Sequence, residues 1–414
     1  KYAYELGRVS GVEASAIGCN WSFAPIVDIN RNWRNPIIST RTWSADADQT
    51  LELSLEYMRG IMESGILPAA KHFPGDGIDE RDQHLSFAPN TLSVEDWNAT
   101  FGKVYSGLIE AGLPSIMAGH IALPEYVKYF NPEATTQEIY MPATLSKYIL
   151  TDLLRGKMNF NGLVVTDASH MVAMTSAMKR SEMLPTAIAA GSDLFLFFND
   201  PDEDFQWMMD GYKNGIITDE RLEEALTRIL GTKAALGLHK KAKTEILPEK
   251  EVAMAKIGLE ENKAIAKEVS DKAITLVKNT KNQLPITPQT HKRIMLYTIE
   301  NGGFTPNKMD KATLQDRVKA ELEAQGFEVD VFDNSAGLNG KQLLASTPVK
   351  EFVSKYDAVM LFISVTGFST SNVRRITWNL PMGPEIPWYV TELPTVCVSV
   401  HNPFHLIDVP MVPT

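Results

Sequence analysis

Cysteine is nearly absent from this chain, which has only Cys19 and Cys397 among its 414 residues. Two cysteines so far apart do not form a disulfide framework, so we expect both to be small core side chains in a reducing compartment, the cytoplasm. The first residues, KYAYELGRVSG, contain neither an initiator Met nor an apolar signal-peptide core. We therefore expect a fragment whose natural N-terminus is absent, and secretion stays open.

Basic residues and long apolar runs are also scarce. The chain has 40 lysines and arginines against 51 aspartates and glutamates, for a net charge of −11. Binding to nucleic-acid phosphates requires a basic surplus, so the composition argues against a nucleic-acid partner and favours a small or neutral substrate. No stretch approaches the roughly 18 apolar residues of a membrane-spanning helix. No pattern specifies an oligomeric state.

Short apolar runs, by contrast, recur along the first half of the chain. Continuous apolar runs of this length indicate parallel strands that are buried on both faces. Stretches with helical spacing follow several of them, and this alternation predicts a (β/α) barrel of the TIM type. The predicted strands are 23–29, 66–70, 115–118, 163–166 and 194–198, and the predicted helices are 51–63, 93–112 and 144–155.

The domain organisation follows from counting these elements. A (β/α)8 barrel needs eight strands and only five are visible, so we expect the barrel to be incomplete on its N-terminal side. The charged stretch 238–252 predicts a linker, followed by a helix at 253–270. Short strands at 273–286 and 291–297, then alternating helices and strands, predict a three-layer α/β sandwich that is itself truncated. The predicted domains are a barrel at 1–240, a linker and helix at 241–275, and the sandwich at 276–414.

Polar side chains follow three of the predicted barrel strands. Lys71 and His72 come after the second strand, His120 after the third and Asp167 after the fourth. Because the carboxyl ends of barrel strands form the active-site face, we expect these side chains to converge there. Each one alone could equally be a satisfied polar strand end, and for His120 a structural role is favoured.

The segment KHFPGDGIDERDQH, residues 71–84, is the most unusual part of the sequence. Its acids and histidines could bind a metal, but their spacing fits neither a calcium loop nor a helical zinc motif, so we expect no metal and no other cofactor. A solvated loop is the plainer alternative. Asp82 and His84, however, can form a pair in which the carboxylate fixes the imidazole tautomer and leaves the other nitrogen as a general acid/base. Asp167 could then supply the second carboxyl group that retaining glycoside hydrolysis needs.

Several segments in a fixed order carry a family resemblance. They are NWSFAPIVDIN, RNPIISTRTWS, KHFPGDGIDERDQH, IMAGHIALP, PATLSKYILTDLLRG, GLVVTDASHM and AITLVKNTKNQLPI. With them the chain resembles glycoside hydrolase family 3, and within it the β-N-acetylglucosaminidase branch. The resemblance implies that Asp167 is the nucleophile of a covalent glycosyl-enzyme, that His84 is the general acid/base, and that Asp82 orients His84.

The same resemblance implies the sugar-binding residues Arg41, Lys71 and His72. The chain departs from the family pattern at two nearby places: PGDG stands where PGHG is common, and TDASHM has one acid where many relatives have two. Neither departure touches the three catalytic positions. The glycines of the 71–84 segment predict a movable connection that lets His84 swing over the sugar.

The leading functional hypothesis is a retaining, exo-acting hydrolase that releases terminal β-linked N-acetylglucosamine from cell-wall-derived or related glycoconjugates. Three alternatives stay open. The first is a β-glucosidase or β-xylosidase on the same scaffold. The second is a β-N-acetylglucosaminide phosphorylase, because a neutral histidine, unlike an anionic glutamate, would not repel phosphate. The third is a non-catalytic sugar-binding homologue.

Overall fold

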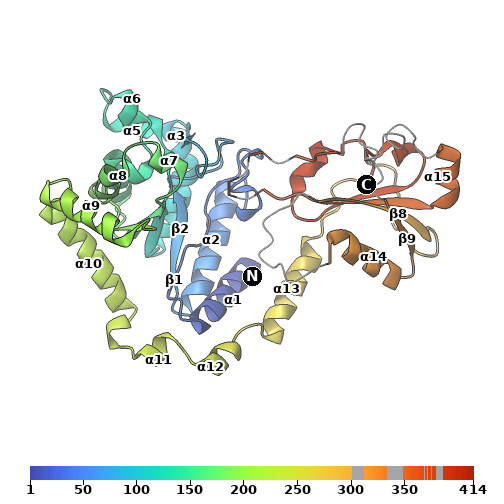
Figure 1. The fold of residues 1–414 in the computed structure, drawn as a ribbon, viewed down its shortest axis with the longest axis horizontal. Coiled ribbons are helices and arrows are strands. Elements are labelled where there is room, and N and C mark those ends of the chain that lie inside the picture. Colours follow the sequence, from blue (N-terminus) through green and yellow to red (C-terminus); the bar gives the residue numbers. More distant parts are fainter. Residues whose placement is uncertain (301–311, 333–347, 368, 371, 374, 379–385) are drawn as a thin grey trace. The chain divides into compact units, whose positions relative to one another are not determined.

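The computed structural model describes residues 1–414 except for 301–311, 333–347, 368, 371, 374 and 379–385. Two compact units make up this part of the chain (Figure 1). Unit 1 consists of Lys1–Lys272 together with Ser369–Asn372, and unit 2 consists of Ala273–Phe368 and Val373–Thr414. Parts of the predicted sandwich domain therefore lie outside the described residues.

Unit 1 is built on a parallel five-stranded sheet with the order β1-β2-β4-β6-β7. Neighbouring strands pair in parallel along the whole order. A second, two-stranded sheet pairs β3 with β5. The strands are β1 (Trp21–Ser22), β2 (Leu67–Phe73), β3 (Ala88–Pro89), β4 (Ser115–Ala118), β5 (Ile121–Ala122), β6 (Leu163–Ala168) and β7 (Leu194–Leu196). This is an α/β domain of the TIM-barrel type in which five strands of the main sheet are described.

The first predicted strand, 23–29, forms only in fragments. A short strand lies just before it at β1, and one further bridge pairs Ile26 with Lys71. Pro25 interrupts the ladder because proline has no N–H to donate, although its carbonyl oxygen still accepts from the Lys71 N–H. The prediction of one continuous strand was therefore wrong, while its position beside β2 was right.

Helices pack against several strands of this sheet. The two long N-terminal helices, α1 and α2, pack side by side next to β1 and β2 (Figure 1). The helices of unit 1 up to residue 235 are α1 (Tyr2–Ala16), η1 (Ser39–Arg41), α2 (Ala47–Met62), α3 (Val94–Trp97), η2 (Asn98–Gly102), α4 (Lys103–Glu110), α5 (Pro124–Phe130), α6 (Thr136–Ile139), η3 (Ala143–Leu145), η4 (Tyr148–Lys157), α7 (Val172–Thr175), α8 (Arg180–Ala189), α9 (Pro201–Lys213) and α10 (Asp219–Ala235). The predicted helices at 51–63, 93–112 and 144–155 thus all exist, the last two in several pieces.

The amino-terminal end of the sheet carries a buried charge cluster. The Asp193 carboxylate, just before β7, accepts hydrogen bonds from the guanidinium groups of Arg155 (2.8 Å), Arg228 (3.4 Å) and Arg221. The Asp193 side chain is fully buried. Because a buried carboxylate is stable only when it is paired, this cluster has a structural role in joining η4 and α10 to the sheet.

Short helices fill the predicted linker. They are η5 (Leu238–Lys240), α11 (Lys243–Ile246) and α12 (Lys250–Met254), followed by α13 (Glu260–Ala273). The helix predicted from residue 253 begins seven residues later, because Gly258 adopts a φ of 66°, in the left-handed region that ends helices. The Gly258 N–H donates to Glu13 of α1, which anchors this stretch.

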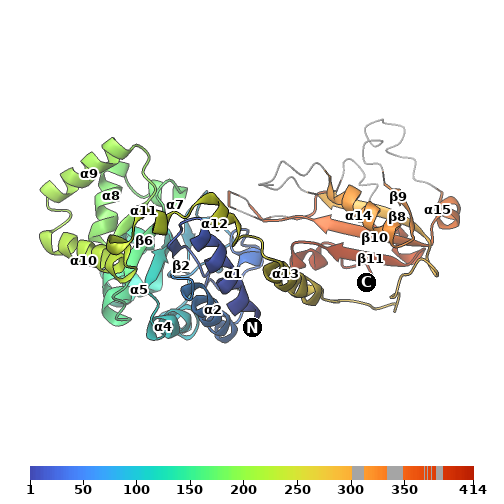
Figure 2. The ribbon, with the colours of Figure 1, turned by 90° about the horizontal axis from the view of Figure 1, so that it is seen from below.

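Unit 2 contains a parallel four-stranded sheet with the order β11-β10-β8-β9. Alternate residues of β8 belong to two apolar clusters on opposite faces, since successive strand side chains point to opposite sides. Helix α14 covers the face of Ile294 and Leu296, and helix α15 with η7 covers the face of Met295 and Tyr297 (Figure 2). The elements are β8 (Arg293–Glu300), α14 (Leu314–Ala324), β9 (Glu328–Val331), α15 (Val349–Lys355), β10 (Ala358–Ser364), η7 (Trp388–Thr391), β11 (Thr395–Ser399) and η8 (Pro403–Ile407).

Two further predictions from the sequence fail. The stretch 273–286 forms no strand, and its apolar side chains Ile274, Leu276 and Val277 are 63 to 84% exposed, so that no described strand pairs with it. Cysteine burial was also overestimated: Cys19 is exposed and Cys397 is only partly buried. Within the described residues, no helix has the length and apolar character needed to cross a membrane.

Candidate active site

Asp167 lies near the carboxyl end of β6, inside a ring of cationic and imidazole groups. Its Oδ2 is 3.8 Å from His72 Nε2, and its Oδ1 accepts a hydrogen bond from the Ala168 N–H at 2.7 Å. Burial by itself would raise the pKa of the Asp167 carboxyl, but His72, His120, the Ala168 N–H and the Lys71 ammonium together hold that pKa below its ordinary value. The carboxylate is therefore ionised at neutral pH.

Lys71 and Arg41 lie on the same side of the site. Burial and the nearby Arg41 guanidinium lower the pKa of Lys71, whereas the carboxylates of Asp167 and Asp28 oppose this shift. Arg41, in the short helix η1, donates from Nη1 to the Ile37 carbonyl oxygen at 2.9 Å. Two predicted sugar-binding residues thus lie within electrostatic reach of each other, and one of them within reach of Asp167.

Asp28 fixes the orientation of His72. Asp28 Oδ2 is 2.7 Å from His72 Nδ1, and Asp28 Oδ1 accepts hydrogen bonds from the backbone N–H groups of His72 and Asp76. Burial alone would raise the pKa of Asp28, but His72 and these N–H donors outweigh it and lower that pKa. An ionised Asp28 keeps a proton on His72 Nδ1 and turns Nε2 toward Asp167. The sequence reasoning missed Asp28, whose partner is 44 residues away.

Asp82 and His84 form the predicted pair. Asp82 Oδ1 is 2.7 Å from His84 Nδ1 and also accepts the His84 backbone N–H at 2.8 Å. The Asp82 side chain is almost wholly buried, whereas that of His84 is 27% exposed. Burial would raise the pKa of Asp82, but the bonds to His84 and to the Thr370 N–H hold it below the ordinary value. This geometry places a proton on Nδ1 and leaves Nε2 for a substrate atom.

Hydrogen bonds hold the loop before the pair at several points. Asp76 accepts from Asn35 Nδ2 at 2.8 Å and from Gln83 Nε2 at 3.1 Å. The Asn35 and Gln83 amides are oriented by backbone N–H groups that bind their oxygens. Burial and the Asp28 carboxylate raise the pKa of Asp76 to about 8, against the effect of these donors. The loop is packed and bonded in this conformation, and its movement over a bound sugar stays a prediction.

His120 is a link between the two halves of the site. Its backbone N–H donates to Gln83 Oε1 at 2.8 Å, and its Nε2 lies 2.9 Å from the Ala168 carbonyl oxygen. Since a carbonyl oxygen only accepts, Nε2 carries the proton and Nδ1 accepts from the Thr144 hydroxyl. Burial lowers the pKa of His120, which keeps the ring neutral. His120 therefore fastens the segment of the acid/base pair to the strand of Asp167.

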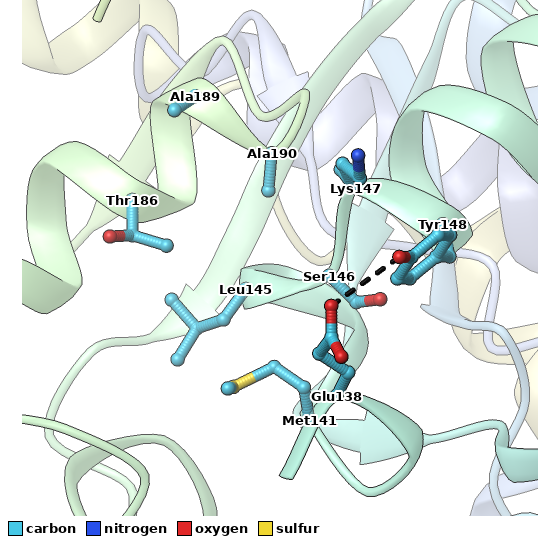
Figure 3. A pocket seen from close by; sticks show the side chains of 9 residues that line it. All are labelled: Glu138, Met141, Leu145, Ser146, Lys147, Tyr148, Thr186, Ala189 and Ala190. Atoms are coloured by element: carbon cyan, nitrogen blue, oxygen red, sulfur yellow. Dashed lines mark hydrogen bonds between the residues drawn. The ribbon is translucent and has the colours of Figure 1, made fainter. Parts of the chain in front are cut away.

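No group of three or more histidine, cysteine, aspartate or glutamate side chains is arranged to hold a metal ion anywhere in the described ranges. A cavity of about 300 Å³ lies elsewhere, among the outer helices α6, η3, η4 and α8 (Figure 3). Its wall includes Met141, Leu145 and Thr186, and Glu138 accepts a hydrogen bond from Tyr148 at its edge. None of the predicted site residues lines this cavity.

The chain has relatives among known proteins. A family model described as the glycosyl hydrolase family 3 N-terminal domain matches residues 1–232. The chain is 42% identical over 406 residues to a β-N-acetylglucosaminidase/β-glucosidase of Cellulomonas fimi, covering 98% of this chain and 70% of the relative. It is 28% identical over 296 residues to β-hexosaminidase A of Pseudoalteromonas piscicida, covering 67% of this chain and 47% of that relative.

Solved structures give the same result for the fold. The chain matches the β-glucoside phosphorylase BglX bound to 2FGlc with a TM-score of 0.90 and 37% identity, covering all of this chain and 71% of the other. A family 3 β-N-acetylglucosaminidase from Paenibacillus matches with a TM-score of 0.76 and 23% identity over 99% of this chain and 73% of the other, which shows the fold alone. These matches confirm the resemblance found in the sequence: the chain belongs to glycosyl hydrolase family 3, a family of glycosidase enzymes.

Proposed function

We propose that this protein is a retaining, exo-acting glycosidase that releases terminal β-linked N-acetylglucosamine. The observation that carries the proposal is the presence of a partly buried, ionised Asp167 and an oriented His84–Asp82 pair, joined through His120. Retaining glycosidases need one nucleophilic carboxylate and one group that acts first as an acid and then as a base.

The reaction then proceeds in two displacements. The Asp167 carboxylate attacks the anomeric carbon while the bond to the leaving oxygen breaks, and the His84 Nε2 proton passes to that oxygen. A glycosyl ester of Asp167 results. In the second step a water molecule gives a proton to His84 and attacks the anomeric carbon, the ester bond breaks, and the sugar leaves with its original configuration. Asp82 stabilises the imidazolium form of His84, which is present before the first step and is restored after the second.

We assign sugar binding to the polar groups beside the nucleophile. Lys71 and Arg41 offer N–H donors to ring hydroxyls, and His72 offers its Nε2 from a ring that Asp28 holds in place. The Lys71 ammonium also favours the anionic form of Asp167. The N-acetyl preference itself is supported by the name of the Cellulomonas fimi relative, which includes both a β-N-acetylglucosaminidase and a β-glucosidase.

The substrate assignment is tested by comparing two aryl glycosides that share a leaving group. We expect the aryl β-N-acetylglucosaminide to be cleaved with a kcat/KM at least about tenfold above that of the aryl β-glucoside, as one well-placed hydrogen bond to the acetamide would provide. Equal or faster turnover of the glucoside would overturn the N-acetyl assignment but leave the glycosidase assignment intact.

Phosphorolysis is the second candidate, because the structure with a TM-score of 0.90 and 37% identity to this chain is a β-glucoside phosphorylase. In that case a phosphate oxygen attacks the glycosyl ester of Asp167 in place of water, and sugar 1-phosphate leaves. A neutral acid/base such as His84 imposes no charge repulsion on the incoming phosphate, and Lys71 and Arg41 add positive charge nearby.

Product analysis with and without inorganic phosphate separates these two reactions. Hydrolysis predicts free sugar at the same rate in both conditions. A phosphate-dependent rate with sugar 1-phosphate as product would replace hydrolysis by phosphorolysis, with the same residues in the same roles. Chloride at matched ionic strength serves as the control for salt effects on the charged site.

A further inference from the structure

A four-residue segment, Ser369–Asn372, belongs to unit 1 although the chain on either side of it belongs to unit 2. Within it, the Thr370 backbone N–H donates a hydrogen bond of 2.7 Å to Asp82 Oδ2. The donor and acceptor are 288 residues apart in sequence. The acid/base pair therefore receives a contact from a part of the sequence far beyond the barrel-type strands.

The Thr370 N–H binds one carboxylate oxygen of Asp82, and His84 binds the other. Asp82 Oδ1 binds the backbone and the ring of His84, and Oδ2 binds Thr370. The Asp82 side chain is only 1% exposed. Bulk water therefore cannot easily replace the Thr370 N–H, and a buried carboxylate oxygen that loses a donor is less well stabilised.

The backbone of Thr370 adopts an unusual conformation to make this bond. Its φ is 65°, in the left-handed region that β-branched residues rarely adopt. Strained backbone conformations of this kind persist where surrounding contacts impose them, and they often occur at functional sites. The side chain is exposed, so the backbone N–H is what this residue contributes to the site.

We propose that the Thr370 backbone N–H is a positioning group for the acid/base pair, which holds the Asp82 carboxylate in the orientation that aligns His84. This inference rests on the proposed role of Asp82 and His84 in catalysis. Thr370 acts through Asp82 and contacts no reacting atom. A carboxylate fixed at both oxygens cannot rotate, so the imidazole bound to it keeps Nε2 aimed at the leaving oxygen.

The pH dependence supplies a readout that general destabilisation does not imitate. The bonds from His84 and Thr370 lower the pKa of Asp82 against the effect of burial. Among the described residues, His84 is a titratable group bound to Asp82, and His120, Asp167 and His72 lie within electrostatic reach of the pair or of one another. Loss of the Thr370 N–H removes one cause of the lowered pKa, so Asp82 protonates at higher pH and the acidic limb of the kcat profile moves upward.

The test compares full-length Thr370→Pro, Thr370→Gly, Asp82→Asn and the double variant Thr370→Pro/Asp82→Asn with an aryl glycoside across pH. Proline has no N–H and cannot adopt a positive φ, whereas glycine keeps the N–H and favours that φ. We expect kcat to fall on the order of tenfold in Thr370→Pro, with the acidic limb at higher pH, which corresponds to loss of one charge-assisted hydrogen bond. Thr370→Gly keeps the acidic limb of the parent protein.

The double variant decides whether Thr370 acts through Asp82. We expect Thr370→Pro to have no further effect on kcat once Asp82 is Asn, because the carboxylate it orients is absent. The proposal is overturned if Thr370→Pro lowers kcat by the same factor in both backgrounds, or if Thr370→Gly moves the acidic limb as far as Thr370→Pro does. An unchanged kcat in Asp82→Asn alone would overturn the acid/base assignment itself, and this proposal with it. Thermal unfolding of each variant checks that the fold is retained.

Discussion

Asp167 is the residue on which the proposed chemistry depends most. We predict that Asp167→Gly lowers kcat at least about a thousandfold, because the proposed reaction uses this carboxylate as its nucleophile. Added azide should restore turnover and give an α-glycosyl azide, since the small anion occupies the vacated space and attacks from the same face. Product configuration by NMR checks this.

The azide experiment has one control variant and one outcome that would contradict the prediction. The exposed Asp202→Asn should leave kcat unchanged, because that carboxylate lies on the surface of α9. A β-configured azide product would instead show that azide replaces water, which would assign Asp167 to a different role.

The loss of kcat/KM on removing His84 should be largest for substrates whose leaving group must be protonated. For His84→Ala we expect kcat/KM to fall about 10²- to 10⁴-fold with a poor leaving group such as an alkyl alcohol, and far less with dinitrophenol, which leaves without protonation. The exposed His170→Ala, three residues after Asp167, is the matched control and should behave like the parent protein. A uniform loss across leaving groups would contradict the acid role.

Lys71 links sugar binding to the charge of the nucleophile. Its ammonium is one of the groups that lower the pKa of Asp167, so Lys71→Met raises that pKa and moves the acidic limb of kcat/KM to higher pH. Activity requires the carboxylate, and a higher pKa means that it is lost earlier as the pH falls. We also expect KM to rise about tenfold through loss of a charged hydrogen-bond donor. Lys147→Met, on an outer helix, should change neither quantity.

At the residue scale, functional residues could be predicted where they are close in sequence to each other or to a recognisable strand. Asp82 and His84 are two residues apart, and Asp167 directly follows an apolar strand pattern, so each could be predicted. Asp28 and Thr370 could not, because their roles arise only from contacts 44 and 288 residues away. For Thr370 the functional group is the backbone, which every residue type except proline shares.

At the level of elements, the conformation of the 74–84 loop depends on a crowded glycine, Gly77. Gly77 has a φ of 110°, and a Cβ at that position would lie 2.1 Å from the Ile29 carbonyl oxygen. We predict that Gly77→Ala costs about 3 kcal/mol or more of folding free energy, which corresponds to a melting temperature lower by about 6 °C or more. Because the displaced loop carries Asp82 and His84, kcat should fall as well.

Gly112, outside this loop, serves as a control that separates backbone strain from steric crowding. Gly112 also has a positive φ, of 86°, but a Cβ there would meet nothing within 4 Å. Gly112→Ala therefore measures the backbone strain alone, about 1 kcal/mol, and should leave kcat unchanged. Calorimetry on both variants checks the difference, and equal losses would mean that close packing of the loop contributes nothing.

Elements were predictable where local pattern and tertiary pairing agree. The apolar runs at β2, β4 and β6 were found because strands buried on both faces need continuous apolar sequence. The stretches 23–29 and 273–286 were also predicted as strands, and both predictions were wrong. Pro25 breaks the ladder of the first, and the second has no described strand to pair with. An apolar run is able to form a strand, but it does so only where a neighbouring strand is available to pair with it.

For the whole molecule, the connection after α10 should be the weakest part of unit 1. The residues from 240 to 256 are largely exposed and form only short helices. We predict that the first tryptic cut within residues 1–272 falls in this stretch, at exposed lysines such as Lys240, Lys241 and Lys250, because proteases need locally unfolded chain. Intact-mass spectrometry of early fragments checks this. A first cut at Lys71, inside β2, would contradict the described packing.

The α/β class of unit 1 was predictable because repeated strand and helix signals constrain topology strongly. The family match over residues 1–232 agrees with the barrel-type reading of that region. The assignment of Ser369–Asn372 to unit 1 was not predictable, since no local pattern marks a short segment that leaves one unit to contact another part of the fold.

The long separation between Asp82 and Thr370 has a consequence for biosynthesis. Translation at roughly 5 to 20 residues per second delivers Thr370 about 15 to 60 s after Asp82, since 288 residues separate them. By the end of that interval the segments that carry Lys71, His120 and Asp167 have been synthesised, whereas the Thr370 donor to Asp82 does not yet exist. The nascent chain thus passes through a stage in which the proposed nucleophile is present and the proposed acid/base pair lacks its Thr370 contact.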